Sequence, residues 1–296
     1  MFERGWLSAN GVLFKGSEHC VLVDTGYVSH ASQTIALVTQ ALEGRPLDRV
    51  VNTHLHSDHC GGNAALQRHY PALQTYIPAG EADHVAQWDE DRLSFRVTGQ
   101  QCPRFRFDHV LQPGSDQWLG DRAWQVHGAP GHDPHSIILF EPASGTLISA
   151  DALWENGFGV VFPELVGEPS FDDVAATLDV IESLAPRTVI PGHGRIFSDV
   201  ANALATARRR LNGLASQPHK HAWHALKVLM KFKLLEVQAL SAENWQQWCR
   251  DTPYFGMIQS RFFGDRGLSA LLEEVLADLV ASGAARRDHD GRVSNL

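Results

Sequence analysis

The 296-residue sequence has no stretch that could cross a membrane and few cysteines. No apolar run approaches the ~20 residues that a transmembrane helix needs, and the segment Met1 to Trp6 lacks the basic and apolar parts of a secretory signal. Its four cysteines show no paired spacing, which argues against a disulfide framework. We therefore expect a protein of the reducing cytoplasm that has no membrane partner.

Positive charge is scarce in the first 200 residues, where 12 lysines and arginines stand against 25 aspartates and glutamates, a net charge of −13. Residues 201–296 carry 13 against 9, a net charge of +4. A surface that binds nucleic acid needs clustered positive charge. The acidic part therefore argues against a nucleic-acid partner and leaves a small molecule as the expected substrate, although the basic remainder keeps a weaker nucleic-acid contact open.

One short segment concentrates side chains that can bind metal, because His54, His56, Asp58 and His59 fall within six residues. Neutral imidazole and carboxylate are ligands that suit zinc and similar divalent metals. An apolar run before the segment predicts a buried strand, and Gly61-Gly62 after it predicts a tight turn into a helix. The ligands are therefore expected on a strand-to-helix loop. A solvated polar loop is the alternative.

The same chemistry recurs at three later positions, each after an apolar run that predicts a buried strand. His132 and His193 each follow a glycine, which lets the backbone turn sharply and present the imidazole inward. Asp151 follows the run from Gly145 to Ala150. Together with the first segment, this gives five histidines and two aspartates at the ends of predicted strands.

Taken together, these motifs resemble the metallo-β-lactamase superfamily over about the first two-thirds of the chain. The resemblance implies an α/β fold, an αββα sandwich whose metal site lies at one edge of two packed sheets. It also implies a first metal ion held by His54, His56 and His132, and a second held by Asp58, His59 and His193. Asp151 would bridge the two ions. Because several true β-lactamases carry Cys or Ser at the place of Asp151, the set is more similar to those of glyoxalase II, the lactonases and RNase Z.

The resemblance further implies a binuclear hydrolase with two divalent ions per chain, zinc by preference and iron or manganese as alternatives. A hydroxide shared between the ions would attack an ester-like bond, and Asp58 would be the catalytic residue that orients it and passes a proton to the leaving group. Thioesters and lactones are the preferred substrates. A phosphodiesterase or nuclease and an iron-dependent sulfur dioxygenase, which uses fewer ligands on one metal, remain open. A non-catalytic binding protein is disfavoured because the ligand set is complete.

Aromatic residues near Asp151 are candidates for a substrate pocket. Trp154, Phe158 and Phe162 stand in or beside a glycine-containing loop, and loops next to a catalytic centre commonly carry substrate contacts. Burial in the core is the alternative. The polar segment 81–106 is either a lid over the site or a surface excursion, and Cys60 is expected to be a small packing residue rather than a ligand.

The chain is expected to divide into a catalytic domain, 1–215, and a smaller, mainly helical accessory domain, 216–296. Helices are predicted at 222–235, 242–248 and 268–281, followed by a β-hairpin over 284–294 with an Asp-Gly turn. Helices followed by a hairpin resemble a winged helix. Such a unit could contact nucleic acid, but we expect it to pack against the catalytic domain or a second chain and to form a homodimer, because one face of the last helix is too apolar to remain exposed.

His219, His221 and His224 are interpreted as a solvated helix start rather than a third metal site.

Overall fold

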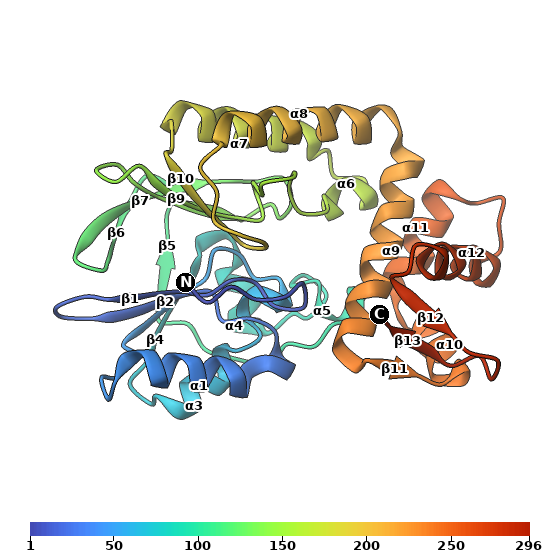
Figure 1. Cartoon of the computed structure of the whole chain (residues 1–296), viewed down its shortest axis with the longest axis horizontal. Coiled ribbons are helices and arrows are strands. Elements are labelled where there is room, and N and C mark those ends of the chain that lie inside the picture. Colours follow the sequence, from blue (N-terminus) through green and yellow to red (C-terminus); the bar gives the residue numbers. More distant parts are fainter.

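The computed structural model describes all 296 residues and contains two five-stranded sheets that face each other between helices (Figure 1). The first sheet is ordered β1 (Val12–Lys15), β2 (Cys20–Val23), β3 (Arg49–Val51), β4 (Gln74–Pro78) and β5 (His109–Leu111). The second is ordered β10 (Thr188–Pro191), β9 (Thr146–Ala150), β8 (Ile137–Glu141), β7 (Arg122–Gly128) and β6 (Asp116–Leu119). Strands β2 to β5 are parallel neighbours, as are β9 and β10.

The inner strands are apolar almost without alternation because both of their faces are covered. All four residues of β2 and all five of β8 are buried, as expected for strands between a second sheet and a helix layer. Val23 pairs with Val51 across the first sheet, and both pack against Leu139 and Ile148 of the second. The space between the two sheets is therefore filled mainly by apolar side chains.

Helices cover the outer face of each sheet. α1 (Ala31–Leu42) and α3 (Asn63–His69) bury Val38 and Leu66 against the first sheet. α7 (Phe171–Leu184) and α8 (Val200–Ser216) cover the second sheet, at the top of Figure 1. The predicted αββα sandwich is thereby confirmed.

Six short helical segments complete this part of the chain. They are the 3₁₀ turns η1 (Val28–His30) and η2 (Ala79–Glu81) and the helices α2 (Ser57–Cys60), α4 (Ala82–Gln87), α5 (Phe95–Thr98) and α6 (Phe162–Val166).

The carboxyl-terminal region is mainly helical, as predicted. It consists of α9 (Pro218–Val237), β11 (Ala239–Leu240), α10 (Ala242–Asp251), α11 (Pro253–Phe262), α12 (Leu268–Ala281), β12 (Ala285–Arg287) and β13 (Val293–Asn295). The predicted hairpin is confirmed as the antiparallel pair β12 and β13, and β11 joins it to give the order β11-β13-β12. Helix α11 was not expected from the sequence.

The apolar stripe of α12 is buried inside its own chain. Leu271, Val275 and Leu276 are at most 1% exposed and belong to one cluster with side chains of α9 and α11. The stripe therefore gives no support to the homodimer, which was inferred from the need to cover this apolar face. The homodimer and the division at residue 215 remain predictions.

None of the helices combines the length and the apolar composition that crossing a membrane requires.

Candidate metal centre

The predicted metal ligands lie at one edge of the sandwich, each just after a strand. His54 and His56 lie between β3 and α2, whereas Asp58 and His59 lie within α2 rather than in an open loop. His132, Asp151 and His193 follow β7, β9 and β10. Their nitrogen and oxygen atoms form three groups, each with its atoms within 4.8 Å of one another. The groups are His54, His56 and His132; His54, His59 and Asp151; and Asp58, His59 and His193.

In the first group, three imidazole nitrogens converge. His56 Nδ1 lies 3.1 Å from His54 Nε2 and 2.8 Å from His132 Nε2. His132 Nδ1 lies 2.6 Å from the Val160 carbonyl oxygen, which can only accept, so Nδ1 carries the proton and Nε2 presents a lone pair. One ring nitrogen of His56 cannot hydrogen-bond well to two neighbours at once. A cation among the three nitrogens satisfies them all, so this group fits a metal such as zinc.

The group of Asp58, His59 and His193 leaves a buried ring nitrogen without a hydrogen-bond partner. His59 Nδ1 donates to Asp24 Oδ2 at 2.8 Å, so His59 Nε2 is the ring nitrogen that faces the other ligands, and this buried atom has no hydrogen-bond partner. His193 Nε2 lies 3.1 Å from Asp58 Oδ2. These atoms also fit a divalent cation, because an unpartnered buried polar atom is costly without one.

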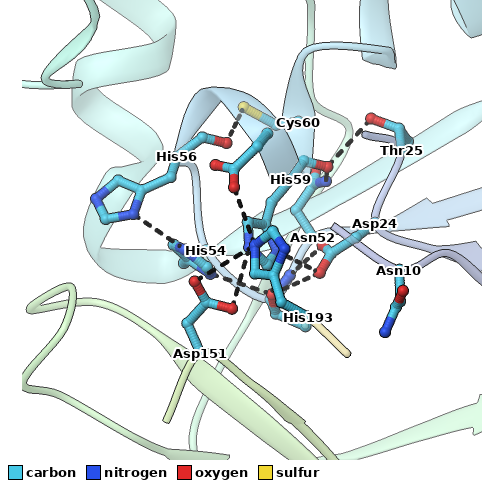
Figure 2. A network of polar contacts seen from close by, with 12 residues as sticks. Asn10, Asp24, Thr25, Asn52, His54, His56, His59, Cys60, Asp151 and His193 are labelled. Atoms are coloured by element: carbon cyan, nitrogen blue, oxygen red, sulfur yellow. Dashed lines mark hydrogen bonds and ion pairs between the residues drawn. The ribbon is translucent and has the colours of Figure 1, made fainter. Parts of the chain in front are cut away.

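Asp151 lies close to ligands of both the group of His54, His56 and His132 and the group of Asp58, His59 and His193. Figure 2 shows its carboxylate next to His54 and His193. Its Oδ1 is 3.4 Å from His59 Nε2, while its Oδ2 is 3.4 Å from His132 Nε2 and 3.8 Å from His193 Nε2. Oδ1 thus faces one of these groups, through His59, whereas Oδ2 faces both, through His132 and His193. This is a placement expected of a shared ligand.

Burial and neighbouring charges set the protonation of these groups in the metal-free protein. Burial, together with the adjacent imidazoles, holds the pKa of His54 well below its usual value and lowers that of His132 to about 4. Burial alone would raise the pKa of the Asp58 and Asp151 carboxyls, but the surrounding imidazoles lower both. Neutral imidazole and ionised carboxylate are the forms that coordinate metal.

His59 differs from the other imidazoles. Its burial acts to lower its pKa, but Asp151, Asp24 and Asp58 together raise it well above the usual value. Several carboxylates around one buried imidazole form a site that favours a positive charge, and a divalent cation would displace the proton.

Asp24 is a partner of this site that sequence reasoning did not find. Its Oδ1 accepts from the Thr53 backbone N–H at 2.9 Å, while its Oδ2 accepts from His59. Asp24 fixes the ring of His59, as outer carboxylates commonly do for metal-binding histidines. Its backbone is left-handed, with φ of 57°, and Ala150 before Asp151 is similar at 47°. The available signal was a carboxylate directly after a buried apolar strand, the same signal that identified Asp151.

The glycines next to the ligands act in different ways. Gly131 has φ of 135°, which L residues rarely adopt, so the expected sharp turn before His132 is present. Gly192 does not have such a φ; instead, a Cβ there would collide with Asp151 Oδ1. Any side chain at Gly192 would therefore displace the shared carboxylate.

A cavity of about 350 Å³ opens beside the ligands. Of the three aromatic residues proposed for a substrate pocket, Trp154 and Phe162 line it. Phe158 does not, because it is 1% exposed and packs into the core beneath α7 and α8. Trp154 also donates from Nε1 to Asp151 Oδ1 at 3.2 Å. Trp6, which the sequence did not suggest, stacks on the ring of His193 with centroids 5.3 Å apart.

Two further parts of the chain complete the walls of the cavity. From segment 81–106, Ser94, Thr98 and Gln100 line it. That segment is packed rather than loose, since Phe95 and Phe105 are buried in a small core with Leu55 and Ile77. From the carboxyl-terminal helices come His224, Val228, Leu229 and Phe232 of α9 and Tyr254 of α11.

The interpretation of His221 and His224 as solvated residues is wrong, because α8 and α9 pack against each other through this turn. His221 is 1% exposed and His224 lines the cavity, whereas His219 is exposed. Burial, with smaller effects from His224 and Arg210, lowers the pKa of His221 to about 4.

Replacing His221 by phenylalanine is expected to reduce the acid sensitivity of folding. Between pH 6.5 and about 4, the imidazole of His221 takes up a proton in the unfolded state but not in the folded state. The contribution of His221 to the free energy of unfolding, which is present above pH 6.5, is therefore lost as the pH falls. Removing the imidazole removes that loss, on the order of 3 kcal/mol at pH 4. Urea unfolding of wild type and His221→Phe across this range measures the difference. The exposed control His219→Gln should follow wild type, and parallel profiles for all three proteins would contradict the assignment.

Comparisons with known proteins agree with this fold. A family model described as the metallo-beta-lactamase superfamily matches residues 4–193. The hydroxyacylglutathione hydrolase of Gloeothece citriformis (strain PCC 7424) is 29% identical over 159 residues, 52% of this chain and 50% of the relative. That of Trichormus variabilis (strain ATCC 29413 / PCC 7937) is 30% identical over 188 residues, 58% of this chain and 62% of the relative. The chain thus spans about half the length of the first of these relatives and less than two-thirds of the second.

Solved structures resemble the whole chain as well as its first part. A metallo-beta-lactamase family protein from Thermus thermophilus covers 97% of this chain and 94% of its own, with a TM-score of 0.54 and 20% identity. A beta-lactamase domain protein from Burkholderia ambifaria covers 96% of this chain and 86% of its own, with a TM-score of 0.56 and 21% identity. At these identities the likeness concerns the fold. A third protein, solved in a di-iron-bound form, is 26% identical with a TM-score of 0.55, and covers 69% of this chain and 96% of its own.

Proposed function

The chain belongs to the metallo-beta-lactamase superfamily, and we propose that it is a metal-dependent hydrolase of ester-like bonds, with thioesters or lactones preferred. The observation that carries the proposal is Asp151, whose carboxylate lies between two complete groups of ligands beside one cavity. The curated relatives support the choice of bond, because they are named hydroxyacylglutathione hydrolases and that name denotes hydrolysis of a thioester. Zinc is the proposed metal; iron and manganese are alternatives, and one structural neighbour was solved with two irons.

We assign His54, His56 and His132 to one ion, Asp58, His59 and His193 to the other, and Asp151 to both. When bound, such ions lower the pKa of water to about 7 and polarise the oxygen of the scissile carbonyl. Asp58 is 14% exposed and lines the cavity, so its carboxylate can orient the attacking water, accept its proton and pass that proton to the leaving group.

Other residues hold this site in place and exclude water from it. The Trp154 N–H fixes Asp151, and Trp6 covers the ring of His193. Val160 and Phe162 add apolar surface to the wall next to His132. A mostly apolar lining favours substrates with an apolar portion and limits competing contact with bulk water.

Two observations disfavour the alternatives. A sulfur dioxygenase of this superfamily would use fewer ligands on one metal, and here both groups are complete. A phosphodiesterase acting on nucleic acid would need several cations near its substrate, and Arg210 is the only lysine or arginine that lines the cavity.

We also propose that residues 216–296 form the winged-helix-like accessory domain expected from the sequence and that this domain acts by closing the substrate cavity. Helix α9 supports the proposal, since one of its faces forms part of the cavity wall.

A hydrolysis screen on protein of measured metal content tests the proposed function. Thioesters, lactones, β-lactams and phosphodiesters are compared before and after treatment with a chelator. We expect a thioester or a lactone to be the best substrate, with activity lost on chelation and restored by zinc. Hydrolysis of phosphodiesters alone, or ester hydrolysis that is insensitive to complete metal removal, would overturn the proposal.

A further inference from the structure

One corner of the cavity contains a fixed positive charge that has no acidic partner. Arg210, on α8, lines the cavity and has no carboxylate within 4.0 Å, whereas Arg208 on the same helix lies 2.8 Å from Asp179 and 2.7 Å from Glu182. The Arg210 guanidinium is held over the ring of Phe158, with its Cζ 5.3 Å from the ring centroid. It also packs against Gly157 so closely that a Cβ there would collide with it. The guanidinium is therefore positioned by the protein but not neutralised by it.

His224 leaves this charge unchanged. Burial, followed by the charges of Arg210 and Lys227, lowers the pKa of His224 to about 4, so its ring is neutral near pH 7. A guanidinium can only donate, so Arg210 donates from its terminal nitrogen to His224 Nε2, at 3.2 Å. No other hydrogen bond joins the Arg210 side chain to the protein. Its remaining N–H groups form a planar donor face of the kind that binds a carboxylate.

No other side chain of the cavity wall offers an unpaired positive charge outside the metal centre. Lys227 is paired with Asp278 at 3.0 Å and does not line the cavity. The acidic side chains of the lining are Asp58 and Asp151, and both are held by the imidazoles of the metal centre. An anion that enters the cavity therefore meets one unpaired cation away from the proposed metal ligands, the guanidinium of Arg210.

Helix α9 adds an apolar wall that begins at this corner. His224, Val228 and Phe232 are spaced four residues apart and lie on one face of α9, over a length of about 12 Å. Leu229 lies beside them in the lining. A ligand with an anionic end at Arg210 and an apolar body along α9 would match this order of side chains.

We infer that Arg210 binds a carboxylate of the substrate, so that the cavity selects esters or thioesters with one carboxylate and an apolar body. This substrate class rests on the proposed hydrolase function. It differs from the glutathione thioesters in the name of the relatives, because glutathione carries two carboxylates and an ammonium group, and the lining offers no second cation.

A matched pair of probes tests the inference. The S-phenyl monothioester of adipic acid carries one free carboxylate, and its methyl ester replaces that carboxylate by an uncharged ester. Release of thiophenol measures cleavage of the thioester in both probes. We expect wild type to prefer the free acid, and Arg210→Gln to reduce that preference in kcat/KM at least tenfold through a higher KM for the acid. The control Arg209→Gln removes an exposed charge one residue away and should retain the wild-type preference. Arg210→Lys keeps the charge but loses the planar donors, so its preference should be intermediate.

A binding measurement separates this inference from the proposed function. Omega-(phenylthio)hexanoate resembles the acid probe but has no bond to hydrolyse, and its affinity for the metal-containing protein is measured by calorimetry next to that of its amide. We expect tighter binding of the carboxylate, lost in Arg210→Gln and kept in Arg209→Gln. If this holds but no ester is hydrolysed, the hydrolase proposal fails and the carboxylate site stands. If thioesters are hydrolysed but acid and methyl ester are equivalent in wild type and folded Arg210 variants, the inference is wrong and the hydrolase proposal stands.

Discussion

Replacing Asp58 by alanine should lower turnover by on the order of a hundredfold or more while the protein stays folded, because the change removes both an orienting group and a proton acceptor. A hundredfold loss corresponds to about 2.7 kcal/mol of transition-state stabilisation. The structure supports a large effect, since Asp58 lines the cavity and its Oδ2 lies 3.1 Å from His193 Nε2. The pKa of its carboxyl is lowered by His59 and His193 against the effect of burial, so Asp58 is ionised at neutral pH.

The measurement is kcat on the best substrate of the hydrolysis screen, with circular dichroism to show that the variant is folded. Asp83→Asn is a suitable control, because Asp83 is exposed on α4 and does not line the cavity. Metal content is determined for each protein, because Asp58 is also assigned as a ligand. Full activity of Asp58→Ala on a verified substrate would show that the role given to this carboxylate is wrong.

Wild-type protein should hold two divalent ions per chain, and Asp151→Ala should hold fewer and lose nearly all activity. Asp151 has one oxygen 3.4 Å from His59 Nε2 and the other 3.4 Å from His132 Nε2, so its removal takes a ligand from both ions at once. It also leaves His59 Nε2 without the carboxylate that faces it in the buried interior. Loss of metal affinity is expected because neutral imidazoles do not offset the charge of a cation. Asp58 would then be the only carboxylate among the assigned ligands of the two ions.

Elemental analysis of purified protein gives the stoichiometry, and urea unfolding with and without added zinc shows whether the variant has lost the stabilisation that bound metal provides. Glu155→Gln is the matched control, since Glu155 is an exposed acid in the same loop. A wild-type protein that holds a single ion through the three histidines of the first group alone would contradict the binuclear assignment. That result would favour the sulfur dioxygenase instead.

The sequence was sufficient to identify the candidate ligands because their chemistry is local. His54, His56, Asp58 and His59 lie within six residues, so any fold of that segment keeps them near one another. Each of the other ligands follows an apolar run, and strands that are buried in one sandwich bring their ends to the same edge. The bounds of α12 were likewise predicted correctly, since a broad apolar stripe at helical spacing specifies a helix without knowledge of its partner.

Other properties were decided only when distant segments packed together. Phe158 and Phe162 are equally aromatic and lie four residues apart, yet Phe158 is buried in the core and Phe162 lines the cavity. Which side a loop residue faces depends on the elements that cover it, here α7 and α8 on one side and α11 on the other. The same holds for Trp6 over His193, 187 positions away in the sequence.

The sequence by itself thus determined the fold class and identified the candidate ligands, because both depend on residue type, short spacing and the apolar periodicity of single elements. The tertiary structure alone decided the outer partner of His59 and the walls of the cavity. It also made His221, which was expected to be solvated, a buried imidazole, and it placed Arg210 in the cavity wall without an acidic partner. The physical reason is that burial and pairing depend on contacts between elements. The spacing of apolar residues within α8 or within α9 does not predict which side chains of one helix contact the other.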